Sequence, residues 1–139
     1  MFRTMRRKKQ LLSTEEIEVI MKRCTNGVLA CLGDDDYPYA VPVSFVYFND
    51  RIYFHTAKAG HKIDAITRYS KVSFSVVDED TVVSEEYTTY FRSVIAFGKA
   101  RIVGENEKLA AFKELVKKYS GDQPMDAQHK EIEGVFMHI

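Results

Sequence analysis

The chain has 139 residues, of which 45% are hydrophobic, and we expect one domain with a single core and a basic arm over residues 1–12. Lysine plus arginine and aspartate plus glutamate both number 20, so the net charge of zero excludes a global positive field that would attract nucleic acid or an anionic membrane. No apolar run reaches the roughly 20 residues of a membrane helix, and no secretory signal is evident. We therefore expect a cytoplasmic protein.

The first 24 residues combine the basic arm with a helix. Ser13 and Glu16 have the spacing of a capping box, and apolar residues then recur on one helical face, which predicts a helix over Thr14–Arg23. We expect the arm to be solvated or to pack on a partner subunit, with a nucleic-acid-binding tail as the alternative. The basic residues of the arm are Arg3, Arg6, Arg7, Lys8 and Lys9.

A nearly continuous apolar run over residues 27–32 predicts a strand buried on both faces. The three aspartates at 34–36 indicate a solvated hairpin turn and not a calcium loop, because the alternation and distal glutamate of an EF-hand are absent. Cys24 and Cys31 match no zinc-binding spacing, so we expect two reduced, partly buried thiols and no metal site.

The longest alternation in the first half runs over residues 39–48 and predicts one strand. Pro42 lacks a backbone N–H, so this strand should lie at a sheet edge or bulge near the proline. Backbone groups left free there would suit the polar edge of a planar heterocycle. The dipeptide Asn49-Asp50 predicts a tight hairpin turn into the next strand.

The segment Arg51–Arg68 predicts a strand over 51–55, a short loop over 56–60 and then a helix. The first turn of a helix has free N–H groups and the positive end of its dipole, which together favour an anion such as a phosphate. Gly60 would allow close approach of the backbone, and Lys62 would add a charge. A capped helix with a solvated lysine is the alternative.

The second half predicts three more strands and one more helix. We expect strands over 71–77, over 90–103 with a bulge or a sharp coil at Gly98, and over 135–139. A polar connection should span 78–86, and an amphipathic helix should begin at Asn106 with Leu109 among its inward residues. Hairpin connections outnumber helical crossovers, so the pattern favours a mainly β fold, a small antiparallel barrel of six strands with flanking helices.

Three stretches together resemble the nitroimidazole-resistance branch of the pyridoxamine 5'-phosphate oxidase-like proteins, which are FMN-binding split barrels. The stretches are FRTMRRKKQLLS, GVLACLGDDDYPYAVPVSFVYFNDRIYFHTAKAGHKIDAI and TTYFRSVIAFGKARIV. The resemblance covers most of residues 2 to 119. Members of this branch usually continue beyond the last strand to a Gly-Lys-type tail, so in this sequence we expect residues 135–139 to form an exposed sheet edge unless a dimer covers it.

The resemblance implies a homodimer with two FMN molecules in clefts between the subunits. Carried over by position, it places three groups of residues around each FMN, with His55 as the catalytic side chain closest to the reacting face. The phosphate would contact Thr56, His61 and Lys62; the ring would lie along the backbone of Pro42, Val43 and Ser44, near Phe45 and His55; and Tyr90, Arg92 and Ser93 would approach the cofactor, from the partner subunit. Structural roles are the alternatives, including pairing of Arg92 with a carboxylate.

The resemblance implies an FMN-dependent oxidoreductase that takes electrons from NAD(P)H and reduces a small electron-poor acceptor such as a nitroimidazole. The sequence lacks GxSxG, HExxH, P-loop and Rossmann signatures, which fits a protein whose cofactor supplies the difficult chemistry. His55 would donate a proton near neutral pH. Two alternatives are a split barrel that binds haem or a deazaflavin, or binds flavin without turnover, and a small nucleic-acid-binding barrel that uses the basic arm.

Overall fold

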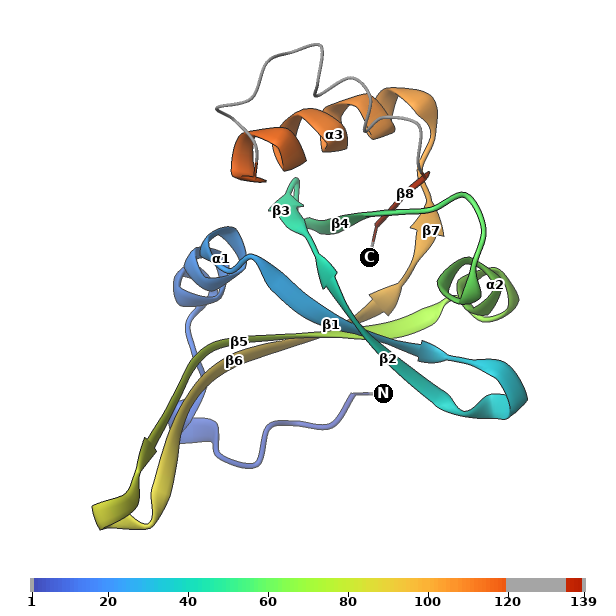
Figure 1. Ribbon diagram of the computed structural model, residues 1–139. Helices are drawn as coiled ribbons and strands as arrows, with labels where there is room; N and C mark the ends of the chain where they lie inside the picture. The colour runs from blue at the N-terminus through green and yellow to red at the C-terminus, as the bar shows by residue number, and fades with distance from the viewer. Residues whose placement is uncertain (1, 120–134, 139) are drawn as a thin grey trace.

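In the computed structural model, residues 2–119 and 135–138 are described, and they form two four-stranded antiparallel sheets with three α-helices around them (Figure 1). The first sheet has the strand order β2 (Pro38–Ser44), β1 (Asn26–Leu32), β5 (Lys71–Val83), β6 (Thr88–Lys99). The second has the order β3 (Val46–Phe48), β4 (Arg51–Thr56), β8 (Val135–His138), β7 (Arg101–Ile102). The helices are α1 (Thr14–Arg23), α2 (His61–Arg68) and α3 (Glu105–Tyr119). The predicted mainly β split barrel with flanking helices is confirmed.

Helix α1 has the bounds that the capping box predicts. The Ser13 side chain accepts a hydrogen bond from the Glu16 backbone N–H at 3.1 Å, and the Ser13 N–H donates to Glu16 Oε1 at 3.2 Å. These two bonds satisfy donors that a helix start otherwise leaves free. Ile20 and Met21 then turn inward and are buried.

Strand β2 is an edge strand, as Pro42 predicts, since its ladder is made with β1 and Pro42 lies opposite Val28. The single strand expected over 39–48 is wrong, because the chain breaks at Phe45 and β3 joins the other sheet. The strand expected over 90–103 is likewise divided, at Ala100. These two breaks turn the six predicted strands into the eight found among the described residues. The Asn49-Asp50 turn is confirmed, with both φ angles positive.

Strands β5 and β6 form a long two-stranded ribbon that extends beyond the body of the molecule (Figure 1). The polar connection predicted over 78–86 is wrong, because residues up to Val83 continue β5 and only Ser84–Glu86 turn. The bulge or sharp coil predicted at Gly98 is also wrong. Gly98 pairs in register with Val72, whereas the irregularity lies between Val77 and Glu79. From Val77 to Val83 the residues of β5 are mostly exposed, so this part of the sequence lacks the alternation that marks a half-buried strand.

The first sheet buries only one of its faces within this chain. Along β1 exposure alternates, and Leu29 is fully buried while Val28 is 37% exposed, so the expected burial of both faces is wrong for the single chain. Ile95 and Phe97 of β6 are 62% and 58% exposed. This surface, the outer sheet face, leaves a contiguous apolar area open that a monomer usually covers.

Strand β8 is an interior strand, and the expected exposed edge at residues 135–138 is wrong. Its backbone pairs with β4 on one side and with β7 on the other. Helix α3 covers one face of the second sheet, where Tyr53 and Phe112 belong to a second, smaller core (Figure 1). Leu109, predicted to face inward, is 43% exposed.

None of the described helices is both long enough and apolar enough to cross a bilayer.

Asp78, at the irregularity in β5, joins the ribbon to α1. Its carboxylate accepts hydrogen bonds from Arg23 Nε at 3.1 Å and Nη2 at 2.6 Å, and the Arg23 contact lowers the pKa of Asp78. A carboxyl whose folded pKa is depressed stabilises the fold above its unfolded pKa of about 3.9, and that contribution is lost as the pH falls through its folded pKa.

We expect Asp78→Asn to lower the free energy of unfolding at pH 7 by about 1 kcal/mol. The difference from wild type should shrink as the pH is lowered toward 3, and urea unfolding across this range measures it. Asp80→Asn, an exposed substitution two residues away, is the control. A gap that stays constant over this range would contradict the assigned ion pair.

Candidate functional site

The loop from β4 to α2 encloses a cavity of about 500 Å³, here called the helix-end cavity. The end of β4 supplies His55 and Thr56, and the start of α2 supplies His61 and Lys62. The cavity therefore gathers the three residues predicted to hold a phosphate. Its full lining is Tyr39, His55, Thr56, Ala57, Ala59, Gly60, His61 and Lys62.

Gly60 shapes the start of α2. Its φ of +145° with ψ of 179° is a conformation that only glycine adopts readily, and a Cβ there would meet no atom within 4 Å. Backbone geometry, and not crowding, thus requires glycine at this position. Gly60 is the N-cap residue of α2, and it has no side chain that could accept a hydrogen bond from the first-turn N–H groups. These N–H groups therefore stay available at the start of α2, next to the cavity.

His61 is held by the turn between β1 and β2. Its Nε2 accepts a hydrogen bond from the Asp34 backbone N–H at 3.3 Å, and its ring lies 4.1 Å from the ring of Tyr39. An imidazole nitrogen that accepts carries no proton, so the neutral ring carries its N–H on Nδ1. The Arg68 side chain donates to the carbonyls of Leu32 and Gly33 at 3.0 and 2.7 Å and fixes the same turn against α2.

A second cavity of about 540 Å³ adjoins the first and shares His55 and Lys62 with it. It follows the exposed edge of β2 and is here called the strand-edge cavity. Three of its lining residues, Pro42, Val43 and Ser44, are those predicted to lie along a ring. Its other wall is the apolar side of α3, made by Phe112, Leu115, Val116 and Tyr119.

The α3 wall was missed by the sequence analysis. Phe112, Leu115 and Val116 recur at helical spacing, which predicts a core-facing side equally well. The apolar side of α3 faces β2 across a cavity because of the way the strands are arranged in the two sheets. The periodicity of α3 contains no signal that would separate these two roles.

Phe45 does not line either cavity. Its side chain is fully buried and meets Phe74 edge to face, with ring centroids 5.1 Å apart. The Phe45 side chain therefore belongs to the core and not to the wall of a cavity, in contrast to its predicted position near a ring. Its backbone lies directly after Ser44, where β2 ends.

Within one chain, Arg92 and Ser93 line neither of the two cavities, and the side chain of Tyr90 lies outside the described part of the structure. All three belong to β6, on the ribbon that extends away from α2 and α3 (Figure 1). Arg92 Nη2 lies 3.3 Å from Glu16 Oε2. Within one chain, Arg92 therefore pairs with a carboxylate, which was the alternative to a role at the cofactor.

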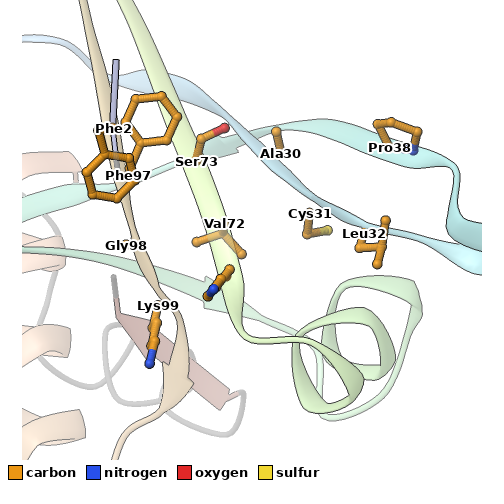
Figure 2. A pocket seen from close by; sticks show the side chains of 11 residues that line it. Phe2, Ala30, Cys31, Leu32, Pro38, Val72, Ser73, Phe97, Gly98 and Lys99 are labelled. Atoms are coloured by element: carbon orange, nitrogen blue, oxygen red, sulfur yellow. The ribbon is translucent and has the colours of Figure 1, made fainter. Parts of the chain in front are cut away.

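A third cavity, of about 860 Å³, lies on the outer sheet face and holds none of the predicted site residues. Figure 2 shows Phe2 of the basic arm stacked on Phe97 of β6, and the two ring centroids are 5.0 Å apart. Cys31, Val72 and Gly98 form part of the remaining lining. This cavity is mainly apolar, which distinguishes it chemically from the helix-end cavity.

The sequence profile described as pyridoxamine 5'-phosphate oxidase matches residues 13–138. The chain belongs to the pyridoxamine 5'-phosphate oxidase family. This confirms the resemblance found in the sequence at the level of the family. No protein with a curated description matches the chain.

Solved structures share the fold of this pyridoxamine 5'-phosphate oxidase family member. A conserved hypothetical protein from Mycobacterium tuberculosis aligns with a TM-score of 0.83 and 24% identity over 98% of this chain and 84% of its own. A candidate 5-nitroimidazole antibiotic resistance protein from Bacteroides thetaiotaomicron aligns at 0.76 and 22%, over 92% and 79%. A FAD and haem binding protein from Mycobacterium smegmatis aligns at 0.70 and 16%, over 91% and 65%. At these identities the likeness establishes the fold.

Proposed function

We propose that this chain is an FMN-dependent oxidoreductase. The observation that carries the proposal is the pair of adjoining cavities that share His55 and Lys62, one at a helix start and one along a proline-interrupted strand edge. Their volumes of about 540 and 500 Å³ lie in the usual range for cofactor sites. A phosphate and a fused ring joined by a short polar chain match this shape.

The helix-end cavity would hold the phosphate. The first-turn N–H groups of α2 and the Lys62 ammonium supply donors and positive charge, and the Thr56 hydroxyl lines the same space. His61 would donate from Nδ1, because the Asp34 N–H already occupies its Nε2. Each of these groups favours an anion over a neutral ligand.

The strand-edge cavity would hold the ring. Backbone groups of Val43 and Ser44 lie at an open strand edge, and the apolar wall of α3 would exclude water from the other side. FMN supplies electron transfer when bound, so the chain needs to bind it, orient it and admit an acceptor. His55, between the two cavities, would hold or deliver a proton at the ring.

The active unit would be a homodimer. The outer sheet face exposes apolar side chains, among them Phe91 at 64%, Ile95 at 62% and Phe97 at 58%, and burial against a second copy would remove them from water. The β5–β6 ribbon would then extend past its own body and bring Arg92 and Ser93, with Tyr90, toward the partner's cavities. Size-exclusion chromatography with light scattering tests this assembly.

The substrates would be NAD(P)H and a small, flat, electron-poor acceptor such as a nitroimidazole. Support comes from the fold shared with the candidate 5-nitroimidazole antibiotic resistance protein from B. thetaiotaomicron. The free thiols Cys24 and Cys31 suit the reducing cytoplasm, where NAD(P)H is available. The fold shared with a FAD and haem binding protein makes haem the alternative ligand to be tested.

Anaerobic stopped-flow reduction of the FMN-loaded chain by NADH or NADPH, followed by mixing with a panel of nitroaromatic acceptors, tests the activity. We expect bleaching of the flavin on reduction and recovery of its absorbance with the acceptor. A loaded protein that neither NADH nor NADPH reduces would contradict the oxidoreductase proposal.

We expect His55→Ala to retain FMN while slowing turnover by 10²-fold or more, on the order of the contribution of a general acid. The slower rate should appear in the acceptor half-reaction and should vary less with pH than in wild type. Unchanged rates and an unchanged pH profile would remove His55 from the mechanism.

A further inference from the structure

We infer that Lys118 and Tyr119, at the end of α3, are positioning residues that fix the strand edge on which the ring would rest. The inference deepens the proposed function and depends on it for the identity of the ligand. Its structural basis is independent of any ligand. It concerns the junction between β2 and β3, where the chain passes from one sheet to the other.

The junction residue Phe45 belongs to neither ladder. The β2 pairing ends with Ser44 opposite Asn26, and the β3 pairing begins with Val46 opposite Tyr53. Phe45 is fully buried, so its backbone N–H and C=O need partners from elsewhere in the molecule. A buried backbone group without a partner would be costly and would allow the junction to shift.

Both partners come from the last two residues of α3. The Phe45 N–H donates to the Tyr119 hydroxyl at 3.0 Å, and that hydroxyl lies 2.7 Å from the Phe45 carbonyl oxygen and also close to the Thr25 carbonyl oxygen. A single hydroxyl proton is donated to one of these two carbonyls at a time. Tyr119 thus joins the start of β1 and the end of β2.

Lys118 reinforces the same junction without lining the strand-edge cavity. Its ammonium donates to the Phe45 carbonyl at 3.0 Å and to the Cys24 carbonyl at 2.5 Å, and it lies 4.1 Å from the centre of the Phe45 ring. Burial lowers the pKa of Lys118. Lys118 is absent from the lining of the strand-edge cavity, whereas Tyr119 forms part of it.

The consequence is that one wall of the cavity sets the position of the other. Helix α3 contributes the apolar wall, and its last turn holds the backbone directly after Pro42–Ser44. An effect of Lys118 on a ligand in the strand-edge cavity must therefore pass through the Phe45 junction or through long-range charge. These two routes can be separated, because Lys117 is an exposed neighbour with the same charge.

The test compares Lys118→Met with Lys117→Met. We expect Lys118→Met to raise the Kd for FMN about tenfold, within the range by which residues without ligand contact change binding, while Lys117→Met leaves it within twofold. Amide hydrogen exchange of the FMN-free proteins should show faster exchange at Phe45 and Val46 in Lys118→Met alone. Tyr119→Phe, which keeps the ring and removes the hydroxyl, should reproduce both effects if Lys118→Met fails to fold.

Each outcome is decisive. Faster exchange at Phe45 with unchanged FMN affinity would show that the junction is held for stability alone and would overturn the inference. Equal weakening of FMN binding by both lysine variants would assign the effect to charge and would also overturn it. If wild type does not bind FMN, the proposed function fails, and unchanged exchange in the variants would separately reject the role of the two residues at the junction.

Discussion

Replacing Lys62 with alanine is expected to raise the Kd for FMN by roughly 10- to 100-fold, because a charge-assisted hydrogen bond to phosphate contributes on the order of 1.5–3 kcal/mol. Lys62 is the cation that lines both the helix-end and strand-edge cavities. Its removal leaves the first-turn N–H groups of α2 in place, so binding should weaken without being abolished. Quenching of FMN fluorescence during titration with the apoprotein measures the effect.

Lys58→Ala is the matched control for Lys62→Ala. Lys58 lies in the same loop, is exposed, and is absent from the lining of both cavities. The change in net charge is identical, so a comparable loss of affinity in both variants would indicate long-range electrostatics and not a phosphate contact. A fall in the free energy of unfolding as large as the loss of binding free energy would contradict the role of Lys62 in binding.

Replacing Gly27 with alanine should destabilise the fold by about 1–3 kcal/mol, the usual cost of overpacking a core. A Cβ at this position would lie 2.4 Å from Cε1 of Phe74 and 3.0 Å from the carbonyl oxygen of Ser75. Phe74 is 1% exposed and packs edge to face on Phe45, so its ring has little room to move. Urea unfolding of the apoprotein measures the loss.

Gly104→Ala provides the comparison for Gly27→Ala. A Cβ at Gly104 would meet no atom within 4 Å, so the free energy of unfolding should change by less than about 0.5 kcal/mol. If Gly27→Ala also changes the free energy of unfolding by less than about 0.5 kcal/mol, close packing of Phe74 against Gly27 is contradicted. Because Phe74 supports Phe45, Gly27→Ala should also weaken FMN binding by a few-fold.

The parts of the fold that sequence predicts correctly depend on local chemistry. The capping box at Ser13 and Glu16 marks the start of α1, Pro42 places β2 at an edge, and Asn49-Asp50 closes a hairpin. Each of these signals acts within a few residues of the structure it specifies. Local signals of this kind do not depend on how distant parts of the chain fold.

The errors arise where distant residues decide the local structure. The break at Phe45 is stabilised by Lys118 and Tyr119, more than 70 residues later, and nothing in the alternation over 39–48 indicates it. β8 lies between β4 and β7, so its interior position depends on how the second sheet is ordered. Residues 77–83 of β5 have no hydrophobic period, because neither side of this part of the strand is buried within one chain.

The candidate site divides in the same way. The helix-end residues Thr56, His61 and Lys62 follow one another within seven positions, so their proximity could be predicted from the strand-loop-helix pattern. The α3 wall and the hydrogen bond from the Asp34 N–H to His61 could not be predicted, because each joins segments that are distant in sequence. The approach of Arg92 to a cofactor requires a second chain, and it stays a prediction.

The most direct test of the central claim is titration of the purified apoprotein with FMN and, separately, with haemin, followed by absorbance and fluorescence. We expect saturable binding of one FMN per chain, quenched flavin fluorescence, and competition by inorganic phosphate at high concentration. No saturable FMN binding, or haemin bound with a Soret shift where FMN does not bind, would contradict the assignment of the two cavities to a flavin.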